Sequence, residues 1–244
     1  MTDQIDKFLD PDSVTVIGVS RNTHKIGRII YDQIINNGRI VYGVNTNNFK
    51  IGKNYIYRSV LETPKVTDLA IYAIPAKFIP DAITQAAVKG IKNHLIISSG
   101  YGETGIKGRD KEIELMNLKE KYKINIQGPN CLGNISTINK FNASFAPMPR
   151  RGNIGLILQS GAIGTSFFDW AQKENIGISH FISLGNKIDL GENDYLSYLV
   201  RDRNTKAIGL YLENIKSPVE FIKQCHEYSK IKPVIILKPG QTEE

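Results

Sequence analysis

The chain has 244 residues, of which 41% are hydrophobic and 23% are charged, and its formal net charge is +7. These values are typical of a globular protein and exclude a disordered or disulfide-stapled chain. Its two cysteines, Cys131 and Cys225, form no paired ligand motif and are compatible with a reducing cytoplasm. The acidic N-terminus lacks the features of a signal peptide, and no apolar stretch reaches about 18 residues, so we expect a cytoplasmic protein without a membrane span.

The positive net charge favours an anionic partner. The lysines and arginines are spread along the chain, without a basic block or an aromatic–basic strip. This distribution disfavours nucleic acid and leaves a polyphosphate ligand as the better candidate.

The first half of the chain alternates short apolar runs with helical stretches. Each run is short, rich in branched residues and followed by a turn residue or a polar group, which is typical of buried strands. The expected strands are 14–19, 40–44, 69–74, 94–98 and 124–128, and the expected helices are 26–37, 78–89 and 110–122. This alternation predicts a parallel sheet with helices on both faces.

A segment without clear period, 139–153, follows and is interpreted as the connection between two domains. The alternation then resumes, with strands expected at 154–158, 178–183, 207–212 and 233–237 and helices at 162–174, 192–202 and 217–229. Ser217, Pro218 and Glu220 form a helix-start pattern that predicts a capping box. We therefore expect two α/β domains in series, 1–145 and 146–244.

A glycine loop joins the first strand to the first helix, between Gly18 and Gly27. Backbone N–H groups and a helix N-terminus meet there, and Arg21, Lys25 and Arg28 add positive charge, so the loop suits a phosphate. A plain tight turn is the alternative.

This loop does not have the G-x-G-x-x-G spacing of nicotinamide-binding proteins. The second strand ends at Asn45, where an acidic residue would be needed to bind the ribose of NAD. Both observations disfavour an NAD(P)-dependent oxidoreductase domain.

The turn "GPNCLG", 128–133, follows the fifth expected strand and places Cys131 on the same edge of the sheet as the glycine loop. No histidine is adjacent in sequence to act as its base. From the residues alone, Cys131 is either a buried structural cysteine or a wall residue beside a ligand.

The order and spacing of several motifs resemble the CoA-binding domain of nucleoside-diphosphate-forming acyl-CoA synthetases, the superfamily of the succinyl-CoA synthetase α-subunit. The motifs are "VTVIGVSRN", "VYGVN", "TDLAIYAIPA", "LIISSGYGETG" and "IQGPNCLGNIS". In the second half, "LILQSGAIGTSFFDWA", "FISLGNKIDLGENDYLSYLVRD", "IGLYLENI" and "VIILKPGQTE" resemble the ligase domain of the acetate-type, ADP-forming members. The resemblance implies a Rossmann-like domain followed by a flavodoxin-like domain that is incomplete at its C-terminus.

The resemblance also implies a site for coenzyme A or an acyl-CoA. Gly18, Ser20 and Lys25 are expected at the phosphates, and Arg21 and Asn45 are further expected CoA-binding residues. Ile74, Pro75, Ser98 and Ser99 are expected along the nucleotide and pantetheine, and Asn130 and Cys131 beside the CoA thiol. The chain departs from the family at Thr46 and Asn47, where "NP" and a basic residue are usual, so that Lys50 would have to substitute.

A second anion site is expected at "LQSGAIG", where Ser160 and Gly161 stand between a strand and a helix start. In the family this position holds a phosphohistidine, with Ser160 as a donor and Glu213 orienting the imidazole. Ser160 is alternatively an ordinary N-cap, and Glu213 a solvated carboxylate.

The chain has four histidines, His24, His94, His180 and His226, and none falls in the family's phosphohistidine motif or has the spacing of metal ligands. We therefore expect no metal site and no ligase activity from this chain alone. A partner with an ATP-grasp domain, of the β-type, would complete the enzyme, and a homo-oligomer is compatible with the resemblance. The alternative is a non-catalytic module that binds or senses CoA.

Overall fold

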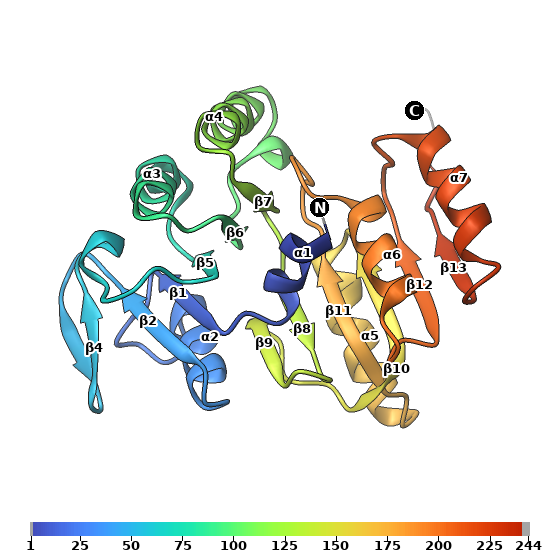
Figure 1. The fold of residues 1–244 in the computed structure, drawn as a ribbon, viewed down its shortest axis with the longest axis horizontal. Helices are drawn as coiled ribbons and strands as arrows, with labels where there is room; N and C mark the ends of the chain where they lie inside the picture. Colours follow the sequence, from blue (N-terminus) through green and yellow to red (C-terminus); the bar gives the residue numbers. More distant parts are fainter. Residues whose placement is uncertain (1, 241–244) are drawn as a thin grey trace.

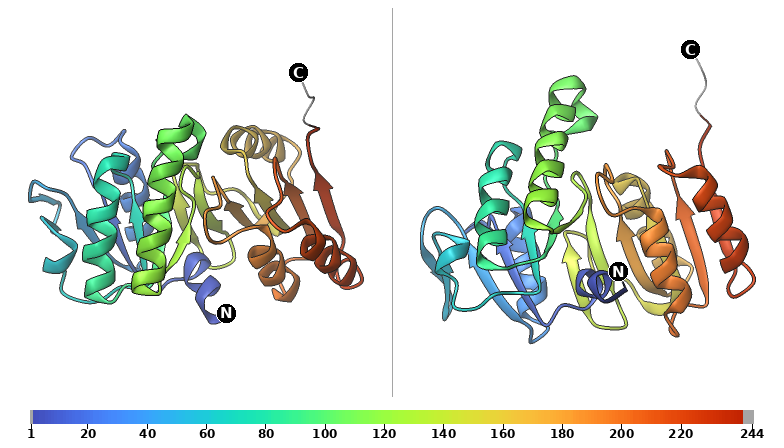
Figure 2. Two further views of the ribbon diagram at one scale, coloured as in Figure 1. Left: turned by 90° about the horizontal axis from the view of Figure 1, so that it is seen from above. Right: turned by 45° about the horizontal axis from the view of Figure 1, so that its top comes forward.

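The computed structural model describes residues 2–240 and arranges them as two α/β units whose sheets lie side by side (Figure 1). The predicted α/β class is confirmed. In both sheets most strands are parallel, and helices cover both faces (Figure 2).

The first sheet has seven strands in the order β3-β4-β2-β1-β5-β6-β7, and all neighbours are parallel except β3 and β4. Its strands are β1 (Ser13–Ile17), β2 (Ile40–Val44), β3 (Phe49–Ile51), β4 (Asn54–Tyr57), β5 (Leu69–Tyr72), β6 (Asn93–Ile96) and β7 (Asn125–Gln127). The sequence analysis missed β3 and β4, which form an antiparallel pair at the edge of the sheet.

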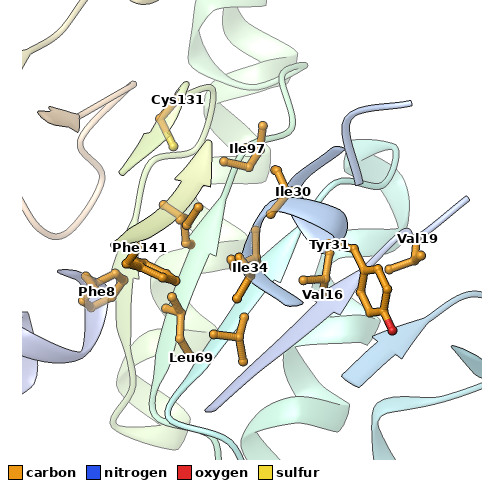
Figure 3. Close-up of a cluster of buried hydrophobic side chains, with 14 of the residues drawn as sticks. Phe8, Val16, Val19, Ile30, Tyr31, Ile34, Leu69, Ile97, Cys131 and Phe141 are labelled. Atoms are coloured by element: carbon orange, nitrogen blue, oxygen red, sulfur yellow. The ribbon is translucent and has the colours of Figure 1, made fainter. Parts of the chain in front are cut away.

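Helix α2 (Ile26–Ile35) covers one face of this sheet, and α3 (Ile79–Lys89) and α4 (Ile106–Tyr122) cover the other. Ile30, Tyr31 and Ile34 form the apolar stripe of α2 and pack on Val16 and Leu69 (Figure 3). Because both faces are covered, the central strand β5 is buried along its whole length, which explains its continuous apolar sequence.

Three short 3₁₀ helices complete the first unit. They are η1 (Val60–Glu62), η2 (Ala76–Phe78) and η3 (Gly102–Thr104). The last two follow the carboxyl ends of β5 and β6, so they border the edge where a ligand is expected.

The second sheet has six strands in the order β13-β12-β10-β11-β8-β9. Its strands are β8 (Gly133–Ser136), β9 (Phe141–Ser144), β10 (Arg151–Leu158), β11 (Ile178–Ser183), β12 (Ala207–Tyr211) and β13 (Val234–Leu237). Strands β10 to β13 pair with one another in parallel, whereas β8 is antiparallel to both β9 and β11.

Helix α5 (Gly161–Lys173) packs on one face of the second sheet, and α6 (Glu192–Arg201) and α7 (Pro218–Tyr228) pack on the other. Ser217 and Pro218 stand at the expected helix start, but the predicted capping box is wrong because the Ser217 side chain accepts no cap hydrogen bond. The Glu220 carboxylate instead accepts a hydrogen bond from Gln224.

The two sheets do not divide at residue 145, because β8 and β9 already belong to the second one. The segment interpreted as a connection contains β9 and the start of β10. Strand β9 alternates the apolar residues Phe141 and Ala143 with the polar residues Asn142 and Ser144. The two polar side chains are buried, and they hydrogen-bond each other and the carbonyl oxygen of Ala146. Its residues Phe141 and Ala143 also join the core beneath α2, so this hairpin belongs to both units.

Helix α1 (Thr2–Leu9), which the sequence analysis did not predict, also bridges the units. Phe8 packs into the core of the first unit, whereas Leu9 packs into the core of the second. The carbonyl oxygen of Phe8 accepts a hydrogen bond from the buried amide of Asn134.

A buried polar cluster completes the junction. The Gln127 amide donates to Asn134 Oδ1 and to the Ser183 carbonyl, both at 2.7 Å. The Tyr195 hydroxyl donates to Gln127 Oε1 at 2.5 Å. Since every polar atom named here has a partner, the cluster joins the units without the penalty of a buried, unsatisfied group.

Candidate functional site

The strand order reverses at the centre of each sheet, between β1 and β5 in the first and between β10 and β12 in the second. In open α/β sheets such reversals leave a crevice at the carboxyl ends of the strands, where ligands bind. Here both crevices open into one cavity of about 1050 Å³. The cavity therefore lies between the two units and takes its walls from both.

Nine of the residues proposed from the sequence line this cavity. They are Ile74, Pro75, Ser98, Ser99, Asn130, Cys131, Ser160, Gly161 and Glu213. They come from the ends of β5, β6, β10 and β12 and from the cysteine turn, so their convergence follows from the parallel arrangement of the strands.

Helix α2 reaches the cavity through its first residue, Ile26, directly after the β1–α2 loop. Gly18 has a positive φ of 103°, and a Cβ there would collide with the carbonyl oxygen of Ala73. A Cβ at Gly27 would collide in turn with the carbonyl oxygen of Gly18. The two glycines thus let the loop and the start of α2 pack tightly against the end of β5.

The remaining predicted CoA residues lie outside the cavity wall, in the loops at its rim. Ser20 accepts a hydrogen bond from the Asn22 amide, and Asn45 donates to the Val19 carbonyl, so both organise loops. The Arg21 guanidinium lies 5.1 Å from the ring centroid of Phe49.

Lys25 occupies the N-cap position of α2, and its exposed side chain makes no hydrogen bond or ion pair within the described residues. Arg28, in contrast, binds Asp32 at 2.8 Å and donates to the carbonyl oxygens of Ser20 and Arg21. Arg28, at the start of α2, therefore stabilises the conformation of the loop, whereas the Lys25 side chain remains available to a ligand.

Cys131 is buried, with 5% of its surface exposed, and its Sγ lies 3.3 Å from the carbonyl oxygen of Ile96. Burial raises the pKa of this thiol to about 12. At neutral pH the side chain is a protonated thiol that forms part of the cavity wall. This environment is the opposite of the one that activates a nucleophilic cysteine.

Ser160 and Gly161 begin helix α5 on the second wall of the cavity. Ser160 is the N-cap, and its hydroxyl oxygen accepts from the Ile163 amide at 3.5 Å. Its neighbour Gln159 accepts hydrogen bonds from the backbone amides of Glu213 and Asn214 at 2.9 and 3.1 Å. The Gln159 side chain thus holds the loop that carries Glu213 beside the N-terminus of α5.

A buried ion pair holds the same loop from the other side. Lys187 Nζ lies 2.8 Å from Glu192 Oε2 and donates to the Asn214 carbonyl at 2.7 Å. The other oxygen of Glu192 accepts from the Lys216 amide at 3.1 Å. Because both charges are paired and hydrogen-bonded, the pair can anchor the Glu213 loop without leaving a bare charge in the interior.

The sequence analysis missed a polar cluster on the cavity wall. The Asn186 amide donates to Glu103 Oε2 and to Glu112 Oε1, both at 2.7 Å. Burial raises the pKa of Glu103, but hydrogen bonds from Asn186 and from the Gly100 and Tyr101 amides outweigh it, so that the pKa is lowered overall. Glu103 is therefore a carboxylate at neutral pH, and it ties the first unit to the second.

Two sequence features pointed to this cluster. Glu103 belongs to the "GYGETG" motif directly after β6, and Asn186 ends the "SLGN" motif directly after β11. Gly185 has a positive φ of 61°, and a Cβ there would collide with the carbonyl oxygen of Pro129. The glycine therefore lets Asn186 approach the cysteine turn, where it accepts from Asn130 at 3.3 Å.

None of the four histidines lines the cavity. His24 and His226 are exposed, whereas His94 and His180 are buried within β6 and β11. Burial lowers the pKa of His94 to about 4 and also lowers the pKa of His180.

The described part of the chain contains no cluster of three or more His, Cys, Asp or Glu side chains arranged to hold a metal ion. No helix in residues 2–240 combines the length and apolar character needed to cross a membrane.

The fold and the cavity define a two-unit α/β protein with a ligand site between facing strand ends. Residues 12–137 match the family model described as a CoA binding domain, and residues 151–244 match the succinyl-CoA ligase like flavodoxin domain. The chain belongs to this family of CoA-binding proteins with a succinyl-CoA ligase like domain.

The comparisons with individual proteins agree. The chain is 39% identical over 240 residues to the alpha subunit of acetate–CoA ligase [ADP-forming] II from Pyrococcus furiosus, covering 98% of this chain and 52% of that one. It is 34% identical to 4-hydroxybutyrate–CoA ligase [ADP-forming] from Nitrosopumilus maritimus, covering 100% and 36%.

Among solved structures, the dinucleotide forming acetyl-coenzyme A synthetase 1 of Ca. Korarchaeum cryptofilum, in complex with phosphate and ADP, is similar with a TM-score of 0.93. The identity is 32%, and the match covers 99% of this chain and 53% of the other. The chain thus spans about half the length of the P. furiosus relative and of this solved structure.

Proposed function

We propose that the chain binds coenzyme A in the cavity and is the α-type part of an NDP-forming acyl-CoA synthetase. The complete reaction would join an acid to CoA at the expense of a nucleoside triphosphate and release the nucleoside diphosphate and phosphate. The observation that carries the proposal is the convergence of the cysteine turn and the Ser160 helix on one cavity.

The cavity wall suits the separate parts of CoA. Apart from the charged residues Glu103, Arg109 and Glu112, the wall of the first unit is neutral, and groups such as Ala73, Ile74 and Ser99 can accept the uncharged pantetheine arm. The cations Arg21 and Lys25 stand outside this wall, in the loop that follows β1. A ligand with its phosphates at that loop and its arm in the cavity would bring its thiol toward Cys131.

The second wall suits a phosphoryl group. The backbone N–H groups at the start of α5 and the helix dipole favour an anion beside Ser160 and Gly161. Glu213 faces the same cavity from an anchored loop, where it can orient a phosphorylated imidazole. That imidazole must come from outside the described residues, since no histidine lines the cavity. We propose that a partner with a nucleotide-binding grasp domain phosphorylates it, in a cytoplasmic complex.

A second candidate function follows from the same observation about the histidines. A protein with the CoA cavity but without a histidine that carries the phosphoryl group would bind CoA or its esters and would not catalyse their formation. Such a protein would be a non-catalytic module that binds or senses CoA. The two candidates differ in catalysis but share the CoA site.

Calorimetric titration with CoA tests the shared site. Ser99→Trp places a large side chain in the cavity from an exposed position and should weaken binding at least about tenfold. The control, Ser229→Trp, makes the same change on an exposed residue after α7 and should bind like the wild type. Equal affinity of all three proteins, or a preference for NADH over CoA, would refute the proposed site.

The cationic rim is tested separately. Lys25→Ala should weaken CoA binding several-fold at about 50 mM salt, and the difference should shrink at about 500 mM because the added ions screen exposed charges. Lys173→Ala removes the same charge at the end of α5 and serves as the control. If Lys25→Ala and Lys173→Ala bind alike, the phosphates lie elsewhere.

A further inference from the structure

A second cavity, of about 470 Å³, lies at the opposite end of α2 from the CoA cavity. Ile26 at the start of α2 borders the first cavity, whereas Gln33 and Asn37 near its end border the second. A ten-residue helix is about 15 Å long, so the two cavities are separate. Its lining residues come from the end of α2, the β8–β9 hairpin and the segment that leads into β10. Helix α2 and β9 contact each other and lie side by side in Figure 1.

The charged residues that line this second cavity are all basic. Lys140 in the β8–β9 turn and Arg151 at the start of β10 both line it, and none of its lining residues is acidic. Both side chains are exposed and have no ion-pair or hydrogen-bond partner within the described residues. Two free cations on one concave surface attract an anion, and the planar arginine fork matches a phosphate in particular.

Helix α2 contributes an unsatisfied acceptor to the residues that line this cavity. The Gln33 side chain donates to the Ala146 carbonyl at 3.3 Å, but its buried Oε1 accepts no hydrogen bond. Asn142 donates to the same carbonyl at 2.9 Å and so fixes the opposite wall. A buried acceptor without a donor is costly unless a bound molecule or water supplies one.

We propose that this second cavity binds a small phosphate monoester that carries a hydroxyl group. Lys140 and Arg151 would hold the phosphate, and the hydroxyl would donate to Gln33 Oε1. Met148 and its two flanking prolines, Pro147 and Pro149, supply an apolar wall for the carbon skeleton. The volume of about 470 Å³ fits a ligand of this size.

Site-resolved NMR of the ¹⁵N-labelled chain tests the proposal with three probes: ribose 5-phosphate, inorganic phosphate and ribose. Ribose 5-phosphate should shift the amides of Asn37, Lys140 and Met148, and it should bind about tenfold more tightly than inorganic phosphate. Ribose alone should not bind. Shifts confined to the start of α5, or no shifts in the second cavity up to tens of millimolar, would overturn the proposal.

Three variants assign the contacts. Lys140→Ala/Arg151→Ala should weaken ribose 5-phosphate binding at least tenfold, whereas the control Lys53→Ala/Lys173→Ala removes two charges from other surfaces and should not. Gln33→Leu should reduce the preference for ribose 5-phosphate over inorganic phosphate toward one. Equal losses in the two double variants, or an unchanged preference in Gln33→Leu, would overturn the assignment. CoA affinity should stay unchanged throughout, which separates this test from that of the CoA site.

Discussion

Alkylation of Cys131 offers a quantitative test of the environment of the cysteine turn. With a pKa of about 12, the thiol is ionised to about one part in ten thousand near pH 8. An unfolded cysteine has a pKa near 8.5 and is about one quarter ionised there. The thiolate is therefore scarcer by about three orders of magnitude in the folded protein. A thiolate of higher pKa is intrinsically more nucleophilic, which recovers roughly half of that factor on a logarithmic scale.

We therefore expect iodoacetamide to label Cys131 about fiftyfold more slowly in the folded chain than in urea, with burial slowing it further. Mass spectrometry of a Cys225→Ser variant measures this reaction at a single thiol. Because the pKa is raised, the folded-state rate should rise about tenfold per pH unit between pH 8 and 10 without a plateau. A folded rate within threefold of the unfolded rate, or a plateau near pH 8, would show that Cys131 is an activated thiol.

Three further variants test the junction and the core. Gly185→Ala places a Cβ against the Pro129 carbonyl at a residue with a positive φ. Urea unfolding should show that the variant is less stable by at least about 1–3 kcal/mol, and CoA binding should weaken. Unchanged stability would contradict the packing described. Tyr195→Phe removes the donor to Gln127 and should cost about 1–2 kcal/mol, whereas a neutral change would mean that the buried cluster does not need this bond. The His94 ring should not titrate by NMR between pH 5 and 8. The folded pKa of His94, about 4, lies below the unfolded value near 6.5, so the neutral ring stabilises the fold fully above pH 6.5. The free energy of unfolding should therefore fall by about 2 kcal/mol at pH 5, because the unfolded chain then binds a proton at this ring. The His94→Gln variant should lack this loss.

The sequence analysis located the long, strongly patterned elements well. Strand 40–44 and strand 178–183 have the expected bounds, and helix α3 starts one residue late. It missed α1, the β3–β4 pair and the β8–β9 hairpin. These elements are short, and one face of β9 is polar although it is buried, so long-range pairing rather than local pattern defines them. The same hairpin explains why the first sheet does not end where the domain boundary was expected.

For the site, strand ends were the reliable signal. Residues that directly follow parallel strands, such as Ser99, Ser160 and Glu213, meet in the cavity because those ends share one edge. The Asn186 cluster was not predicted, because the "GYGETG" and "SLGN" motifs mark its residues but do not reveal how closely one unit approaches the other. The CoA contacts of all the predicted site residues, those on the cavity wall as well as the rim residues Ser20, Lys25 and Asn45, stay predictions.

Helix α1 has a mechanical consequence for ligand binding. Adjacent residues Phe8 and Leu9 are buried in different cores, so a hinge opening between the units would expose at least one of them to water. Each such side chain costs about 1.5–3 kcal/mol to expose, and the polar cluster around Gln127 would open with it. The units should therefore behave as one rigid block on the timescale of ligand exchange. Under the proposed function, CoA would then enter a preformed cavity, and little of its binding energy would be used for domain closure. Any large motion during the reaction would have to come from the segment that carries the phosphoryl group, rather than from a movement between the two units.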